Sequence, residues 1–428
     1  MTSTSYASRR TAGELQGWLV VLVGFVVLSV SFSARFVLSP AMPLLEQDLG
    51  WSRSFVSLGG SLALVCMAAV APLAGNLVDR FGPRVLLALG LAAVGAGMAA
   101  TAAMDAQWHF LLSFSLLAGV GFGIAANHVV STAVSLQFER NRGLAVGIAT
   151  SGSTAGLLLL APLIATMLEK IGWRGSYLIL GGVSASLVLP ALVLVRGRRA
   201  ADAGPARAAS VGTIGRRLGL LIRSPVFHLL LWSFTICGFT TAGVIEGHLI
   251  PYAVACGFPP LDGATAYGVL SGFNLLGMVL AGWLTDRMHR PVLLGGIYVM
   301  RGLSFILLMF IADDPALLFV FAIAFGLFDY STVPVTASLV ASHIGLRIMG
   351  LTMGILSAGH ALGAAVGLFL AGRIFDLFQQ YAWTWSASLA LALVAGVLCF
   401  LIRENRDEGD RVRRVEDGLV SVPEFGRS

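Results

Sequence analysis

The sequence predicts an all-α integral membrane protein whose twelve transmembrane helices form two six-helix repeats. Three observations lead to this fold class. The 428 residues are 57% hydrophobic and only 12% charged, whereas a soluble domain carries about 25% charged residues. Long apolar runs recur along the whole chain, and two charged phrases occur twice with the same spacing. A chain with so little polar surface must expose most of its surface to lipid.

The predicted spans are apolar runs of about 20 residues, bracketed by charged or turn-forming residues. Because lipid offers the backbone no hydrogen-bond partners, each run is expected to form a helix. Their approximate boundaries are 17–42, 54–78, 85–104, 108–137, 144–168, 174–195, 225–255, 263–284, 292–312, 315–341, 348–372 and 382–402.

The basic residues predict the orientation. Of the 28 Lys and Arg residues, 22 fall in the two tails and in the loops that we assign to the cytoplasm. The opposite side holds only Arg53, Lys170, Arg174 and Arg373. Since excess positive charge marks the cytoplasmic side, we expect a multi-pass protein of the cytoplasmic (inner) membrane with both termini in the cytoplasm. The net charge of +6 then reflects topology, and we expect no nucleic-acid binding.

Two phrases repeat at an offset of 207 residues. "LAGNLVDRFGPRVLL" (73–87) and "LAGWLTDRMHRPVLL" (280–294) are identical at nine of fifteen positions, and "RNRGLAVGI" (140–148) matches "RIMGLTMGI" (347–355) at five of nine. A fixed offset indicates a duplicated unit. We therefore expect six-helix halves at 1–195 and 225–402, a cytoplasmic linker at 196–224 and a cytoplasmic tail at 403–428. Two such halves describe one class of secondary transporter.

The phrase "GNLVDRFGPR" (75–84) resembles the loop signature of the major facilitator superfamily, Gly-x-x-x-Asp-Arg-x-Gly-Arg-Arg. It departs at Pro83, where the family usually has Arg, and the second copy "GWLTDRMHR" (282–290) lacks the later Gly. The segments "LGWSRS", "FERNRGLAVGIATSG" and "GWRGSY" resemble the bacterial branch related to monocarboxylate transporters. The resemblance covers nearly the whole chain and implies the major facilitator fold. It also implies a secondary transporter that works by alternating access, not an enzyme.

The repeated phrase predicts a conformational latch on the cytoplasmic side. Glycine lets helices pack closely in lipid, and an aspartate can face the positive N-terminal end of a neighbouring helix while an arginine offers donors to acidic groups. Such a cluster would hold that side shut in one state and release it in the other. A tight, positively charged turn is the simpler alternative. The latch residues are Gly75, Asp79, Arg80, Gly282, Asp286 and Arg287.

Four ionisable side chains lie deep within predicted spans: Arg35, Glu246, Arg301 and Asp329. Each costs at least ~2.5 kcal/mol at mid-bilayer, so each needs a partner or a wet cavity. The family resemblance implies that helices one, four, seven and ten line the central cavity. Depth along the helices then places Arg35 opposite Glu246 across the two halves. Arg301 and Asp329 lie on consecutive helices, which favours a structural ion pair within the second half.

These positions suggest a binding site for an anion. The Arg35 guanidinium matches a carboxylate with two parallel hydrogen bonds, and Glu246 and Asp329 are candidates to hold a coupling proton. Pro334 is expected to break helix ten locally. The other candidates for substrate binding are polar residues of the spans, and any one of them could instead serve helix packing. They are Asn127, His128, Asn274 and His360.

One difference from the monocarboxylate transporter pattern strengthens the case for Arg35 as the anion-binding residue. The resemblance to monocarboxylate transporters implies an Asp and an Arg four residues apart on helix eight, but this chain has Asn274 and Met278 there. An anion-binding residue must then come from elsewhere, which again points to Arg35.

No cofactor or metal is expected. The only lysine, Lys170, follows Glu169 and cannot complete a phosphate-binding loop, and no His or Cys pair has metal-ligand spacing.

We predict a monomeric secondary active transporter for a small organic anion. Its transport is expected to be coupled to protons or to occur by exchange. The alternatives are an efflux pump for amphipathic drugs and a carrier of a neutral metabolite. Helix five ("GSTAGLLLLAPL", 152–163) lacks the Gly-Pro step that antiporters often carry. A sensor or embedded enzyme is disfavoured by the short loops.

Overall fold

The protein is described here by a computed structural model, which describes residues 3–51, 53–138, 140–195, 214–311, 316–378 and 380–404. This part of the chain contains twelve helices that are long and apolar enough to cross a membrane. Each of them overlaps one predicted run, with ends that differ by up to eight residues, which confirms the fold class. Most of the predicted linker (196–213) and of the tail (405–428) lies outside the described residues.

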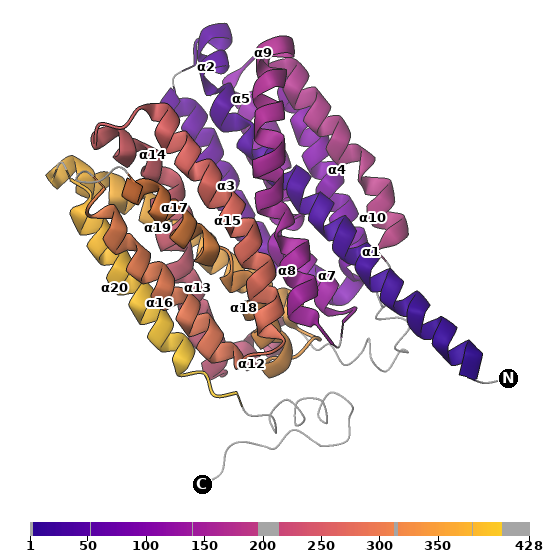
Figure 1. Ribbon diagram of the computed structural model, residues 1–428. Coiled ribbons are helices and arrows are strands. Elements are labelled where there is room, and N and C mark those ends of the chain that lie inside the picture. The colour runs from indigo at the N-terminus through magenta and orange to yellow at the C-terminus, as the bar shows by residue number, and fades with distance from the viewer. Residues whose placement is uncertain are drawn as a thin grey trace.

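The first half is drawn in indigo to magenta in Figure 1 and lies beside the second. Several of its spans consist of more than one helical segment. The segments are α1 (Ser3–Phe36), α2 (Leu38–Leu49), α3 (Arg53–Phe81), α4 (Pro83–Ala102), α5 (Gln107–Phe110), the π-helix η1 (Leu111–Ala118), α6 (Gly119–Ile124), α7 (Asn127–Ser135), α8 (Arg142–Thr150), α9 (Gly152–Ser186) and α10 (Val188–Leu194).

The second half runs from red to yellow in Figure 1, and α20 ends on the side of the bundle where α1 begins. A short helix from the segment between the halves, α12 (Ile214–Ile222), precedes it. The remaining segments are α13 (Pro225–Gly238), the π-helix η3 (Phe239–Ile245), α14 (Glu246–Ala255), α15 (Pro260–Thr285), α16 (Arg290–Leu308), α17 (Ala316–Phe328), α18 (Thr332–His343), α19 (Met349–Phe378) and α20 (Ala382–Phe400).

The first span differs from its predicted range of 17–42. Regular helix is interrupted at Val37 and then continues to Leu49 as α2. Pro40 explains the interruption, because it has no N–H to donate to the carbonyl of Phe36 one turn earlier. The segment ends at Gly50, whose left-handed conformation (φ 66°) is the usual helix terminus for glycine.

The fourth and tenth spans are both broken near their middle. In the fourth span, Ala125 and Ala126 leave the helical conformation between α6 and α7. In the tenth, α17 ends at Phe328 and α18 begins at Thr332. The second break confirms the local interruption expected from Pro334. Irregular backbone at membrane depth is tolerated only where it is buried in protein or lines a cavity.

The apolar core joins the two halves at one end only. One large buried cluster draws residues from both halves, including Val27, Leu87, Leu294 and Leu356. The two smaller clusters are confined to one half each: the first lies around Phe114 in the first half, and the second around Phe305. The halves are thus packed together at the end that holds the repeated phrases.

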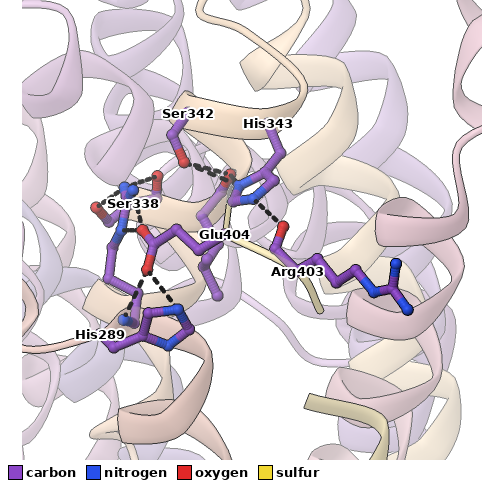
Figure 2. A network of polar contacts seen from close by, with 8 residues as sticks. His289, Ser338, Ser342, His343, Arg403 and Glu404 are labelled. Carbon is purple, nitrogen blue, oxygen red and sulfur yellow. Dashed lines mark hydrogen bonds and ion pairs between the residues drawn. The ribbon is translucent and has the colours of Figure 1, made fainter. Parts of the chain in front are cut away.

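A polar cluster fixes the end of α20 to its own half (Figure 2). The Glu404 carboxylate forms an ion pair with Arg290 and accepts a hydrogen bond from the Arg290 backbone N–H at 3.1 Å. His289 Nε2 lies 3.6 Å from the same carboxylate. Arg290 also donates to Ser338 on α18 at 3.3 Å. All these groups belong to the second half, so the cluster stabilises that half and does not join it to the first.

Candidate substrate-binding site and latch

A cavity of about 180 Å³ lies between the two halves. Helices from both halves contribute to its wall, and most of the predicted site residues are among those that line it. They are Arg35 from α1, Asn127 and His128 from α7, Glu246 from α14, and His360 from α19, together with Tyr330 from the break before α18. Asn274 and Asp329 line a smaller adjoining cavity of about 30 Å³, which Arg35 and Glu246 also reach.

Arg35 contributes a cation to the cavity wall. Its Nη1 lies 3.8 Å from the sulfur of Met67, and its guanidinium carbon lies 4.7 Å from the centre of the Phe32 ring. Both neighbours are soft, uncharged groups. Within the described residues no carboxylate lies within 4.0 Å of Arg35, although Glu246 lines the same cavity. A guanidinium in this position retains donors for an incoming anion.

The N-terminus of α7 also meets the cavity. The preceding residue, Ala126, is extended and supplies no side-chain cap, so the first backbone N–H groups of the helix have no intrahelical partner. His128 is 2% exposed, and its Nε2 has no hydrogen-bond partner in the described structure. The Oδ1 atom of Asn127 is likewise buried and unpartnered. The positive end of the helix, together with the N–H donor that His128 offers in the tautomer protonated at Nε2, favours an anionic group, whereas Asn127 Oδ1 can only accept a hydrogen bond from a substrate.

Glu246 lies at the junction of η3 and α14 and accepts a hydrogen bond from the Tyr330 hydroxyl at 2.8 Å. Both residues line the large and the small cavity. Since a cavity of this smaller size holds a water molecule when its walls are polar, the small cavity can connect Glu246 to Asp329. This arrangement suits the transfer of a proton between two carboxyl groups.

The predicted ion pair between Arg301 and Asp329 is wrong in its geometry. Arg301 Nη1 donates to the backbone carbonyl of Asp329 at 3.2 Å, and not to its carboxylate. The Asp329 carboxylate instead accepts from Asn274 Nδ2 at 3.0 Å. The break between α17 and α18 explains the difference, because it leaves that carbonyl outside the regular helical ladder. Arg301 also contacts the Cys237 sulfur at 3.1 Å and lines neither cavity.

The two aspartates of the repeated phrase each reach across to the other half. Asp79 accepts hydrogen bonds from the backbone N–H groups of Gly350 and Leu351, at 2.8 and 2.9 Å, at the start of α19. Asp286 accepts from Gly143 and Leu144, both at 2.9 Å, at the start of α8. An aspartate at a helix N-terminus satisfies orphan N–H groups and complements the helix dipole.

The latch glycines allow the halves to approach at these two points. A methyl group on Gly282 would lie 2.5 Å from the carbonyl oxygen of Gly143, and the α3–α19 crossing at Gly75 is closer still. In the described part of the chain, no hydrogen bond or ion pair joins either latch arginine to the other half, and the Arg80 side chain is exposed. Arg287 lies over the ring of Trp283 on its own helix, at 4.1 Å.

Arg217 is the main latch residue that the sequence did not reveal, because its surroundings suggested only a linker. Its Nη2 lies 3.0 Å from the Asp79 carboxylate, and both side chains are 2% exposed. Burial lowers the pKa of the Arg217 guanidinium from its usual value, and the nearby Asp79 charge opposes this effect.

Tyr330 was also not identified from the sequence as a cavity residue, although its position directly after Asp329 was a usable signal. Nothing in the sequence pointed to Met67.

The fold and the site define a class of protein: a membrane transporter of two six-helix halves, with a cavity between them that several polar side chains line and with cross-half contacts of two aspartates at one end. Residues 24–312 and 264–426 match the family described as the Major Facilitator Superfamily. The chain belongs to this family. It is therefore a transporter and not an enzyme.

Curated relatives cover nearly the same length. The chain is 29% identical over 382 residues to the uncharacterized MFS-type transporter YcxA of Bacillus subtilis, covering 87% of this chain and 91% of the relative. It is 28% identical to monocarboxylate transporter 11 of Mus musculus, covering 85% and 83%. It is 26% identical to monocarboxylate transporter 13 of Bos taurus, covering 96% of each.

Solved structures share the fold. The proton:xylose symporter XylE aligns with a TM-score of 0.72 and 15% identity, covering 94% of this chain and 99% of that one. The Escherichia coli fucose:proton symporter FucP aligns with a TM-score of 0.74 and 16% identity, covering 91% and 99%. At these identities the likeness concerns the fold alone.

Proposed function

We propose that this transporter carries a small organic anion, such as a carboxylate, across the cytoplasmic membrane by alternating access, and that it couples this movement to protons or to exchange. The observation that carries the proposal is the unpaired Arg35 guanidinium in the cavity between the halves. The N-terminus of α7 and the unpartnered His128 line the same cavity. The similarity to monocarboxylate transporters supports the same class of substrate.

The size of the cavity also supports a small substrate. Its volume of about 180 Å³ is below the 300–1,000 Å³ typical of sites that take drug-sized ligands. An efflux pump for drug-sized amphipathic molecules would need a larger cavity. Within the proposed site Arg35 binds the anionic group, while Asn127, His128 and His360 add hydrogen bonds or orient the rest of the molecule.

Glu246 and Asp329 are the proposed proton-coupling residues. Glu246 lines both cavities and can gain or lose a proton next to the bound anion. Asp329 is 3% exposed, and its Oδ1 has no partner in the described structure. A buried carboxyl group with a free oxygen has room to accept a proton from a water molecule or from Glu246 through the small cavity. In this proposal Asn274 holds the other oxygen of Asp329 and does not contact substrate directly.

Ligand-dependent thermal unfolding of the detergent-purified protein tests the proposal. The panel contains monocarboxylates, dicarboxylates, neutral sugars and amphipathic cations. A ligand at 100 times its Kd stabilises the folded state by ~2.7 kcal/mol, which moves the unfolding midpoint measurably. We expect carboxylates to raise the midpoint of the wild type and to have no effect on Arg35→Gln. Stabilisation by sugars or by cations alone would overturn the anion proposal and favour a neutral-solute carrier or an efflux pump.

A matched variant separates charge at the site from charge elsewhere. Arg373 is an exposed arginine near the end of α19 and lines neither cavity. Arg373→Gln removes the same charge as Arg35→Gln but leaves the cavity intact. We expect this control to keep the response to carboxylates. Loss of the response in both variants would mean that the effect of Arg35→Gln does not report binding in the cavity.

A further inference from the structure

Arg217 is a buried cation on the segment that joins the two halves, and the proposed transport chemistry does not use it. It lies on α12, a nine-residue helix whose buried residues are Arg217 and Leu221, one turn apart. The neighbouring Arg216 is exposed. Arginine is almost never fully buried unless it is paired. Its burial therefore depends on the groups that it contacts.

The Arg217 guanidinium contacts both halves of the transporter. In the first half, Nη1 donates to Asn76 Oδ1 at 2.5 Å, and Nη2 donates to Asp79 Oδ2 at 3.0 Å. In the second half, Nη2 also donates to the carbonyl oxygen of Arg347 at 3.1 Å, just before α19. One side chain of the connecting segment thus binds the two bodies that must separate when this side opens.

The second copy of the latch has no equivalent arrangement. Asp286 is exposed, and among the described residues no arginine forms an ion pair with it. The repeat partner of Asn76 is Trp283, 207 residues later. Since the indole has a donor but no acceptor, it cannot receive the bond that Asn76 accepts. The second copy therefore lacks both the amide oxygen and, among the described residues, the ion-pairing arginine that the first copy has.

We propose that Arg217 is a positioning residue that holds the transporter in the state closed at the latch. In this state the Asp79 carboxylate is removed from water and bonded to two N–H groups of α19, and Arg217 supplies the compensating charge. When the halves separate, the α19 donors and the Arg347 carbonyl move away, and water reaches Asp79. The contact stabilises one state more than the other, which is the requirement for setting their populations. This inference rests on the proposed alternating access but not on the substrate.

Distances between spin labels at the latch end provide the test. Val85 and Val292 are repeat partners at the starts of α4 and α16, and they are 44% and 51% exposed. Cysteines at these positions, in a variant lacking Cys66, Cys237, Cys256 and Cys399, carry the labels for pulsed electron paramagnetic resonance. For Arg217→Gln we expect the ratio of long-distance to short-distance populations to rise about tenfold. Arg217→Lys should restore part of the short-distance population because it retains the charge.

Two further variants make the result decisive. Arg216→Gln removes one positive charge from the exposed face of the same helix and should leave the distances unchanged. Asn76→Leu removes a partner of Arg217 while retaining the arginine, and should shift the populations in the same direction as Arg217→Gln. It decides the question alone if Arg217→Gln does not fold. Unchanged distances in the folded Arg217 and Asn76 variants would overturn the proposal. Because no ligand is present, an error in the proposed substrate leaves these measurements unaffected.

Discussion

Gly75 and Gly350 cross so closely that a methyl group on Gly75 would lie 1.9 Å from the carbonyl oxygen of Gly350. The obstructing atom belongs to the backbone, so no side-chain rotation can relieve the clash. We expect Gly75→Ala to destabilise the closed latch by about 1–3 kcal/mol, lowering both the unfolding midpoint and the transport rate. Gly272→Ala is the matched control, because a methyl group there meets nothing within 4 Å. Equal behaviour of the two variants would contradict close packing at this crossing.

The Arg35 prediction concerns binding strength. Replacing Arg35 with Ala removes charge-assisted hydrogen bonds to the anion, each worth about 1.5–3 kcal/mol. We expect the Kd for a carboxylate to rise at least tenfold while the unfolding midpoint without ligand changes little, since among the described residues Arg35 contacts an uncharged sulfur and an aromatic ring and forms no ion pair. Titration calorimetry measures the Kd directly. Binding equal to that of the wild type would remove Arg35 from the site.

Glu246→Gln tests coupling separately from binding. The amide can still accept the hydrogen bond from Tyr330 but cannot release a proton at neutral pH. We expect proteoliposomes with this variant to lose accumulation driven by a pH gradient and to retain exchange of labelled for unlabelled substrate. Glu169→Gln, at an exposed acid, should keep both activities. Uphill uptake that survives in Glu246→Gln would exclude Glu246 from the coupling role.

Glu404→Gln tests the polar cluster of Figure 2. The variant loses the ion pair with Arg290 and weakens the hydrogen bond to the Arg290 backbone. A loss of about 1–2 kcal/mol is expected for a partly buried charge-assisted contact, seen as a lower unfolding midpoint. Because all partners of Glu404 lie in the second half, the distance between labels at Val85 and Val292 should not change. A shift in that distance would show that the cluster affects the latch.

Most of the fold could be predicted from the sequence, because hydropathy and the repeat offset are linear signals. The twelve spans, the break near Pro334 and the resemblance to the superfamily required no knowledge of contacts. The end of the first span was misplaced because Ala41 and its neighbours after Pro40 continue an apolar run whether or not the helix is interrupted.

The contacts within the site were harder to predict, since depth along a helix does not fix the direction of a side chain. Arg301 and Asp329 do lie near each other, but a broken helix offers the arginine a carbonyl that the sequence does not reveal. Arg217 was hidden for a different reason. Its partners lie 138 and 141 residues earlier in the chain, and a short run rich in Arg, Ala and Gly carries no signal of such distant neighbours.

The unequal protection of Asp79 and Asp286 has a consequence for how the transporter would open. At one seam between the halves the aspartate is buried and pairs with Arg217 of a third element, whereas at the other Asp286 is exposed and accepts only two backbone hydrogen bonds among the described residues. Separation should therefore start at the α8–α15 seam and reach the α3–α19 seam later, when the α19 donors leave Asp79. The first opening would then lie on the α8–α15 side of the interface between the halves. The two sequence repeats therefore need not give the substrate a symmetric path.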